Sequence, residues 1–207
     1  MMRPLQKWLE YLMEKSIYLV SAGLLLAGGC TSMSVDDFEN MGPAFVLEDY
    51  FEGQTRAWGL FEDRMGNVRR EFVVDISGRW DGTTLILTED FRYNDGETET
   101  REWTITKTGS SDYVGTTADA VGTAVGKSAG NAFNWEYDFN LMVEDGAWKV
   151  HFDDWMFLQP NGVLLNKATV SRWGFKIGTV FLSFTKLPAA DAEARSEVIP
   201  SEALELA

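Results

Sequence analysis

Two residues of opposite charge, Glu89 and Arg101, fall on one face of a predicted hairpin that is otherwise apolar. The turn sequence Asn94-Asp95-Gly96 suits a three-residue connection that pairs Tyr93 with Glu97 and therefore sets Glu89 opposite Arg101. The apolar residues on this face are Leu85, Leu87, Phe91, Trp103 and Ile105. Charges in such surroundings are costly unless they are paired. Two interpretations stay open: a polar anchor in which Arg101 binds a ligand carboxylate or phosphate and Glu89 orients it, or a buried ion pair that fixes the register.

A second polar group, formed by Tyr137, Asp154 and Asn166, is predicted on the inward face of the neighbouring hairpins. These residues would line the same cavity as the charged pair, and the alternative is a hydrogen-bonded core network. Trp103 shares the face of Arg101 and joins the candidate ligand-binding residues. Because tryptophans bury large areas, most of them are predicted to fill the core. The tryptophans concerned are Trp58, Trp80, Trp103, Trp135 and Trp148.

Support for catalysis or for a metal site is weak. His151 is the only histidine, and its alternation with Lys149 and Asp153 predicts an outward position, which argues against a haem ligand. The serines therefore lack an inward histidine to activate them. A hydrolase that uses the carboxylates of Glu89 and Asp154 is the enzymatic alternative. We expect no enzyme activity, no metal and no cofactor.

Three further turn sequences predict antiparallel hairpins, and each fixes a register. The turn at Asp145-Gly146 pairs Val143 with Trp148, Leu141 with Val150, Phe139 with Phe152, Tyr137 with Asp154 and Trp135 with Met156. The turn at Pro160-Asn161-Gly162 pairs Leu158 with Leu164 and Met156 with Asn166. The turn at Arg64-Met65-Gly66 pairs Trp58 with Phe72 and Leu60 with Arg70. Segments near residues 45–51 and 175–185 bring the total to about nine or ten strands. We predict an all-β fold, a single antiparallel up-and-down β-barrel, because closure removes unpaired edges and the hairpins follow one another directly. A two-sheet sandwich is the alternative.

Residues 114–132 are rich in small side chains. The glycines are Gly115, Gly122, Gly126 and Gly130. Asp119, Lys127 and several threonines argue against a membrane helix. We predict a small-residue strand and loop that acts as a mobile flap at the barrel mouth, with an ordinary bend as the alternative.

The N-terminal segment has the features of a bacterial lipoprotein signal peptide. An apolar run from Ser16 ends in small residues and then in Cys30, the only cysteine of the chain. The run is shorter than the ~20 residues of a spanning helix. We predict cleavage after residue 29, lipidation of Cys30, and translation from Met1 or Met13. The remaining divisions are a tether over residues 30–44, a barrel domain over 45–187 and an acidic flexible tail over 188–207.

The formal net charge of −14 disfavours nucleic acid and anionic lipid headgroups as partners. Attachment to a membrane is therefore expected through N-terminal acyl chains. Thr31 follows Cys30 in place of the aspartate that retains some bacterial lipoproteins in the inner membrane. We expect an outer-membrane lipoprotein that faces the periplasm.

Several short motifs occur in a fixed order between residues 44 and 187. They are Phe51–Gly53, Trp58–Arg64, Trp80–Leu85, Glu89–Tyr93, Arg101–Trp103, Gly130–Ala132, Asp153–Met156 and Asn166–Ala168. In these motifs the chain resembles the bacterial lipoproteins grouped as domain of unknown function 3833. The resemblance implies a lipocalin-like or calycin-like barrel and carries no activity.

The sequence favours a barrel that binds or carries a small amphipathic or apolar ligand. The alternative is a non-catalytic structural or interaction module of the cell envelope, with a filled barrel and an envelope protein as partner. The volume of the interior separates these hypotheses. A cavity of ~300 Å³ or more near Arg101 favours a carrier, and a filled interior favours the interaction module.

Overall fold

The computed structural model describes residues 33–143 and 146–188. Ten strands and two short helical segments make up this part of the chain. The strands are β1 (Gly53–Asp63), β2 (Val68–Trp80), β3 (Thr84–Tyr93), β4 (Thr98–Lys107), β5 (Asp112–Thr116), β6 (Ala120–Ala129), β7 (Ala132–Val143), β8 (Gly146–Leu158), β9 (Leu164–Arg172) and β10 (Phe175–Lys186). The predicted signal peptide, Cys30 and the tail beyond residue 188 lie outside the described residues. Within them, no helix has the length and apolar character to cross a bilayer.

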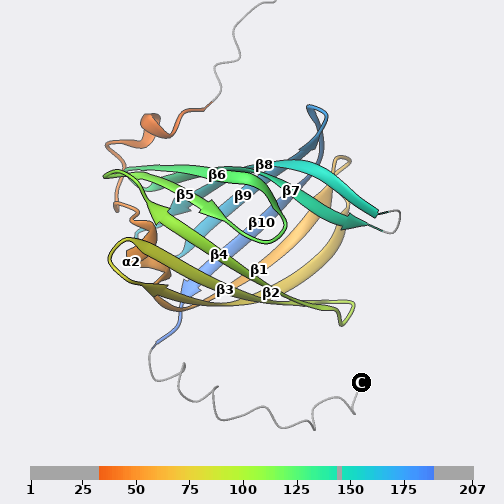
Figure 1. Ribbon diagram of the computed structural model, residues 1–207, viewed down its shortest axis with the longest axis horizontal. Coiled ribbons are helices and arrows are strands. Elements are labelled where there is room, and N and C mark those ends of the chain that lie inside the picture. Colours follow the sequence, from red (N-terminus) through yellow and green to blue (C-terminus); the bar gives the residue numbers. More distant parts are fainter. Residues whose placement is uncertain (1–32, 144–145, 189–207) are drawn as a thin grey trace, which may run out of the picture. The chain divides into compact units, whose positions relative to one another are not determined.

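The strands form one closed antiparallel barrel in which each pairs with its neighbours in the sequence (Figure 1). Closure comes from pairing between β1 and β10, where Trp58 lies opposite Ser183. Each strand therefore has a neighbour on both sides, and the barrel has no free sheet edge of the kind that invites aggregation. The predicted all-β up-and-down barrel is confirmed.

Two predicted registers are confirmed. Across β3 and β4, Glu89 lies opposite Arg101, and across β8 and β9, Met156 lies opposite Asn166. The register predicted for β7 and β8 is wrong by two residues, because Leu141 rather than Val143 lies opposite Trp148. A shift of two preserves which side chains point inward, so the inward face was still assigned correctly.

The register of the β1–β2 hairpin differs from the predicted register by one residue, and this difference reverses which side chains of β1 point inward. The turn lies where it was expected, since the amide of Asp63 donates to the carbonyl of Asn67. A β-bulge then places Phe61 opposite Arg70 and Glu62 opposite Val68, which leaves Arg69 as the extra residue. Trp58 is consequently on the outside and is 49% exposed, so its prediction as core filler is wrong.

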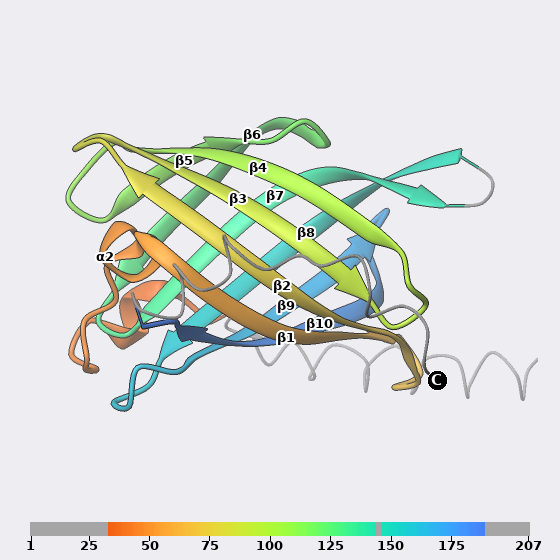
Figure 2. The ribbon, with the colours of Figure 1, turned by 90° about the horizontal axis from the view of Figure 1, so that it is seen from below.

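The segment near residues 45–51 is not a strand. It contains the helix α2 (Leu47–Phe51), which follows a short 3-10 helix, η1 (Val35–Phe38). Leu47, Tyr50 and Phe51 are buried at helical spacing against the barrel. The Tyr50 hydroxyl lies 3.1 Å from the carbonyl oxygen of Gly162 and 3.2 Å from that of Phe184, so it can donate to either. Helix α2 is thereby held against the end of the barrel where β10 and the β8–β9 turn meet (Figure 2).

The small-residue strand and loop predicted over residues 114–132 is present, since the segment contains most of β5, the loop to β6 and all of β6. These strands are paired within the barrel wall, so they do not form the predicted flap. The glycines make room for a ring in the interior. A Cβ atom at Gly115 would lie 2.8 Å from the Trp135 ring, and one at Gly126 would lie 2.3 Å from it. The small residues therefore allow the large side chain of β7 to lie over these strands.

Candidate ligand-binding cavity

A cavity of about 290 Å³ lies inside the barrel. It extends from Leu47 and Phe51 of α2 to Phe61, Arg70 and Tyr93 near the turns at the far ends of β1–β2 and β3–β4. All six residues that the sequence proposed for ligand binding line it. They are Glu89, Arg101, Trp103, Tyr137, Asp154 and Asn166.

The alternation of strand residues explains why these six side chains meet. Successive side chains of a strand point to opposite faces, so odd-numbered residues of β4 and even-numbered residues of β8 face the interior. Trp103 contacts Trp135 and Tyr137 of β7 across the interior, with ring centroids 5.8 and 5.2 Å apart. On the outer face of β8, His151 lies 3.0 Å from Asp138, as expected from its position in the strand.

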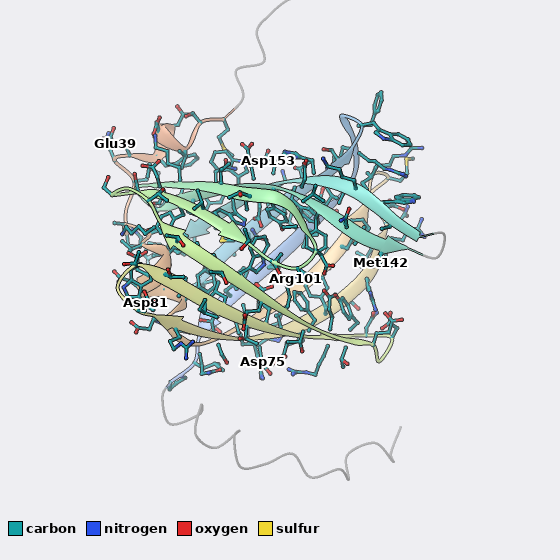
Figure 3. The ribbon with its side chains drawn as sticks, viewed as in Figure 1. Glu39, Asp75, Asp81, Arg101, Met142 and Asp153 are labelled. Carbon is teal, nitrogen blue, oxygen red and sulfur yellow. The ribbon has the colours of Figure 1, made fainter. Side chains whose placement is uncertain are left out.

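Arg101 lies part-way along β4, within the outline of the barrel (Figure 3). Its Nη2 atom is 2.5 Å from Oε1 of Glu99 on the same strand. The guanidinium carbon lies 5.0 Å from the ring centroid of Phe91 and 4.7 Å from that of Phe139. Glu99 also accepts a hydrogen bond of 2.9 Å from the Tyr93 hydroxyl. The ion pair of Arg101 is therefore made with Glu99, and not with Glu89 across the hairpin.

Glu89 faces the cavity and makes no hydrogen bond or ion pair with any residue that the structure describes. Burial raises the pKa of Glu89 to about 7, although the positive charge of Arg101 acts to lower it. The nearby charge of Glu99 raises it further. Glu89 therefore titrates in the neutral range, well above the usual range of a glutamate.

Asp154 and Asn166 form a buried pair on β8 and β9. The Asn166 amide donates to Oδ1 of Asp154 and, at 3.1 Å, to the carbonyl of Trp155. Burial raises the pKa of Asp154 to about 7, against the lowering effect of that hydrogen bond. The negative charges of Glu89 and Asp153 contribute to the same rise.

Tyr137 lies beside these acids. Its ring stacks on Phe152 with centroids 4.9 Å apart. Burial raises the pKa of Tyr137 well above its usual value, and the charges of Asp154 and Glu89 add to the effect. Among the described residues its hydroxyl has no hydrogen-bond partner, and the hydroxyl is therefore free to bond a molecule in the cavity.

Arg70 and Glu99 were not singled out from the sequence. Arg70 lines the cavity toward the β3–β4 turn, with its guanidinium carbon 3.5 Å from the Tyr93 ring centroid. It pairs with Asp95, at 2.9 Å, and with Glu97. Strand alternation could have identified both residues as inward-facing, since Glu99 shares the face of Arg101 and Arg70 shares that of Phe72.

In the described residues, no group of three or more histidine, cysteine, aspartate or glutamate side chains is placed to hold a metal ion. The cavity therefore offers carboxyl, amide, hydroxyl and aromatic groups in an apolar enclosure. Such a combination suits the binding of an organic molecule by hydrogen bonds and apolar contact.

A family model described as Protein of unknown function (DUF3833) matches residues 24–186 of the chain. The chain belongs to this family. All six residues proposed for ligand binding lie inside the matched region, and so does every strand of the barrel. No curated protein matches the chain. The DUF3833 description names no activity, so a function for the cavity has to be argued from its own residues.

Proposed function

We propose that this DUF3833 protein is a lipid-anchored envelope lipoprotein, facing the periplasm from the outer membrane, whose barrel binds or carries a small amphipathic or apolar ligand. The observation that carries the binding function is the cavity of about 290 Å³ with polar groups set into an apolar wall. Its volume lies just below the ~300–1,000 Å³ of typical ligand sites. A small ligand therefore fits better than a long-chain lipid.

The composition of the wall supports an amphipathic ligand. Apolar residues surround the polar groups, among them Phe72, Leu87, Ile105, Met156 and Leu182. Covering apolar ligand surface with such a wall favours binding by about 25 cal/mol per Å². A free carboxyl group and a free hydroxyl in that wall would fix the orientation of the ligand's polar end.

The anchor and its location rest on the sequence alone. Cys30 follows the apolar run and small residues that a lipoprotein peptidase requires, and the residue after it is Thr31. The tether would let the barrel reach ligand near the membrane surface without inserting into it.

A second candidate is an interaction module, and the β9–β10 turn favours it. Trp173 is 82% exposed at this turn and Phe175 is 75% exposed. Large exposed aromatic side chains are common at protein interfaces. This function would not require the cavity to be occupied.

Native mass spectrometry tests the proposal directly. The strands close the barrel within residues 53–186, so a form that begins at residue 31 retains the whole wall. This form is mixed with envelope lipid and metabolite extracts, and bound mass is read in the gas phase. A discrete adduct that disappears when Trp103 is replaced by an alanine supports carriage. A protein that stays free of ligand across all extracts contradicts carriage and leaves the interaction module.

A further inference from the structure

The two arginines of the cavity are already compensated by carboxylates. Arg101 pairs with Glu99 at 2.5 Å, and Arg70 pairs with Asp95 and Glu97. The guanidinium of Arg101 also lies close to two aromatic rings, which favours its charge. Both arginines therefore have a carboxylate partner without an anionic ligand.

Most of the cavity groups that lack partners can accept a hydrogen bond, although the buried Nε atoms of Arg70 and Arg101 are donors without an acceptor in the described residues. Glu89 has no hydrogen bond or ion pair among the described residues, and Asp154 has a partner for Oδ1 but none for Oδ2. The hydroxyl of Tyr137 is also unpartnered. Polar groups shielded from bulk solvent usually have a hydrogen-bond partner, and the half-buried carboxyl of Glu89 is accessible to a molecule in the cavity. A ligand that donates hydrogen bonds would satisfy all three groups together.

The charges around Glu89 point in the same direction. The titratable groups that act on it are Arg101 and Glu99 of β4, Tyr137 of β7 and Asp154 of β8. One guanidinium thus faces three carboxyl groups. With no cation present, Glu89 and Asp154 reduce the excess of negative charge by keeping protons into the neutral range, where the pKa of each lies near 7. A bound cation would replace those protons.

We infer that the polar head of the ligand is an organic cation, of which a primary ammonium group is the simplest, and that Glu89, Asp154 and Tyr137 bind it. This inference rests on the proposed binding function and specifies its ligand class. The apolar part of the ligand then lies toward Leu87 and Ile105, on the α2 side of the cavity.

Three short probes of equal chain length test the inference. Hexylamine, hexanoate and hexanol are titrated by calorimetry into the full-length chain in nanodiscs of zwitterionic lipid, with empty nanodiscs as the blank. A charge-assisted hydrogen bond contributes about 1.5–3 kcal/mol, so hexylamine should bind at least about tenfold more tightly than hexanol, and hexanoate should bind most weakly. Affinity for hexylamine should rise as the pH increases from 6 to 8, because Glu89 and Asp154 then bind the cation without first releasing protons.

Glu89→Gln is the decisive variant, and Asp90→Asn is its matched control. Asp90 is the neighbouring residue on the outer face of β3, where it accepts a 2.7 Å hydrogen bond from Thr100. Glu89→Gln should weaken hexylamine about tenfold or more and remove much of the pH dependence, while hexanol binding stays the same. Asp90→Asn should change neither. Circular dichroism verifies that both variants are folded.

The other outcomes are distinguishable. Tighter binding of hexanoate that is lost in Arg101→Met would make Arg101 the anchor, which overturns the cationic ligand but keeps the binding function. Equal binding of all three probes would also overturn it, since apolar contact alone would then account for affinity. No binding of any probe would contradict the proposed function itself.

Discussion

Two carboxyl groups of this structure, the buried Glu48 and the half-buried Glu89, lie in opposite situations. Glu48 of α2, the helix held against one end of the barrel, is 7% exposed, and both of its carboxylate oxygens have partners. Its Oε1 lies 2.5 Å from Nζ of Lys107, and its Oε2 accepts a 2.8 Å hydrogen bond from the Tyr113 hydroxyl. Glu89, in the middle of the cavity, has neither kind of partner.

The two environments shift the pKa values of these carboxyl groups in opposite directions. Burial alone would raise the pKa of Glu48, but the hydrogen bonds from Lys107 and Tyr113 hold it below its usual value. Burial raises the pKa of Glu89 to about 7, and the more distant Arg101 does not offset it. A buried charge that is fully bonded supports the fold, whereas one without partners costs stability unless something else binds it. The contrast therefore separates the contacts of α2, which stabilise the fold, from the cavity, which is available to a ligand.

Removal of each carboxyl should produce the largest difference between the regions. Glu48→Ala leaves Lys107 and Tyr113 without their shared acceptor, and we expect the free energy of unfolding to fall by about 2–3 kcal/mol. Glu89→Gln removes a charge that has no partner, and we expect the free energy of unfolding to stay the same or to rise by about 1 kcal/mol above pH 7. Urea denaturation measures both. A loss of equal size in the two variants would show that Glu89 is as structural as Glu48.

The pH dependence of stability should also differ in sign. The pKa of Glu89 is higher in the folded protein than its ordinary value near 4.5, so the folded state binds the extra proton and its stability falls as pH rises from about 4.5 to about 7. The pKa of Glu48 is lowered on folding, so its contribution is present above the ordinary value and is lost as pH falls through the folded pKa.

Denaturation of the wild type and of Glu89→Gln at pH 5 and pH 8 isolates the first effect. The wild type should lose more stability than the variant between these values, because only the wild type must ionise Glu89 inside the barrel. Glu48→Gln should not reduce the loss of stability between pH 5 and pH 8. If wild type and Glu89→Gln change in parallel, Glu89 ionises in contact with solvent and the contrast with Glu48 is removed.

Sequence reasoning located most of the cavity because strand alternation is strictly local. The turn at residues 94–96 fixed which side chains of β3 and β4 share a face, and that was enough to bring Glu89, Arg101 and Trp103 together. The error of two residues around β7 and β8 did no harm, since it left Tyr137 and Asp154 on the inner face.

What the sequence did not reveal depends on contacts between distant segments. The bulge at Arg69 reversed the face of Trp58, and turn chemistry does not report a bulge several residues away. Helix α2 was mistaken for a strand because a five-residue segment has too few residues for its period to be recognised. The choice of Glu99 over Glu89 as the partner of Arg101 depends on side-chain geometry, which alternation alone leaves undecided.

The smallest expected effect compares two tyrosines. The Tyr50 hydroxyl can donate to the carbonyls of Gly162 and Phe184, whereas the Tyr137 hydroxyl has no partner in the described residues. Tyr50→Phe should therefore lower the free energy of unfolding by about 1 kcal/mol and leave hexylamine affinity unchanged. Tyr137→Phe should leave the unfolding free energy within about 0.5 kcal/mol of wild type and weaken hexylamine several-fold. Both variants delete one oxygen from a tyrosine ring. A reversed result would place the ligand beside α2, and equal effects would show that the two hydroxyls do not differ in role.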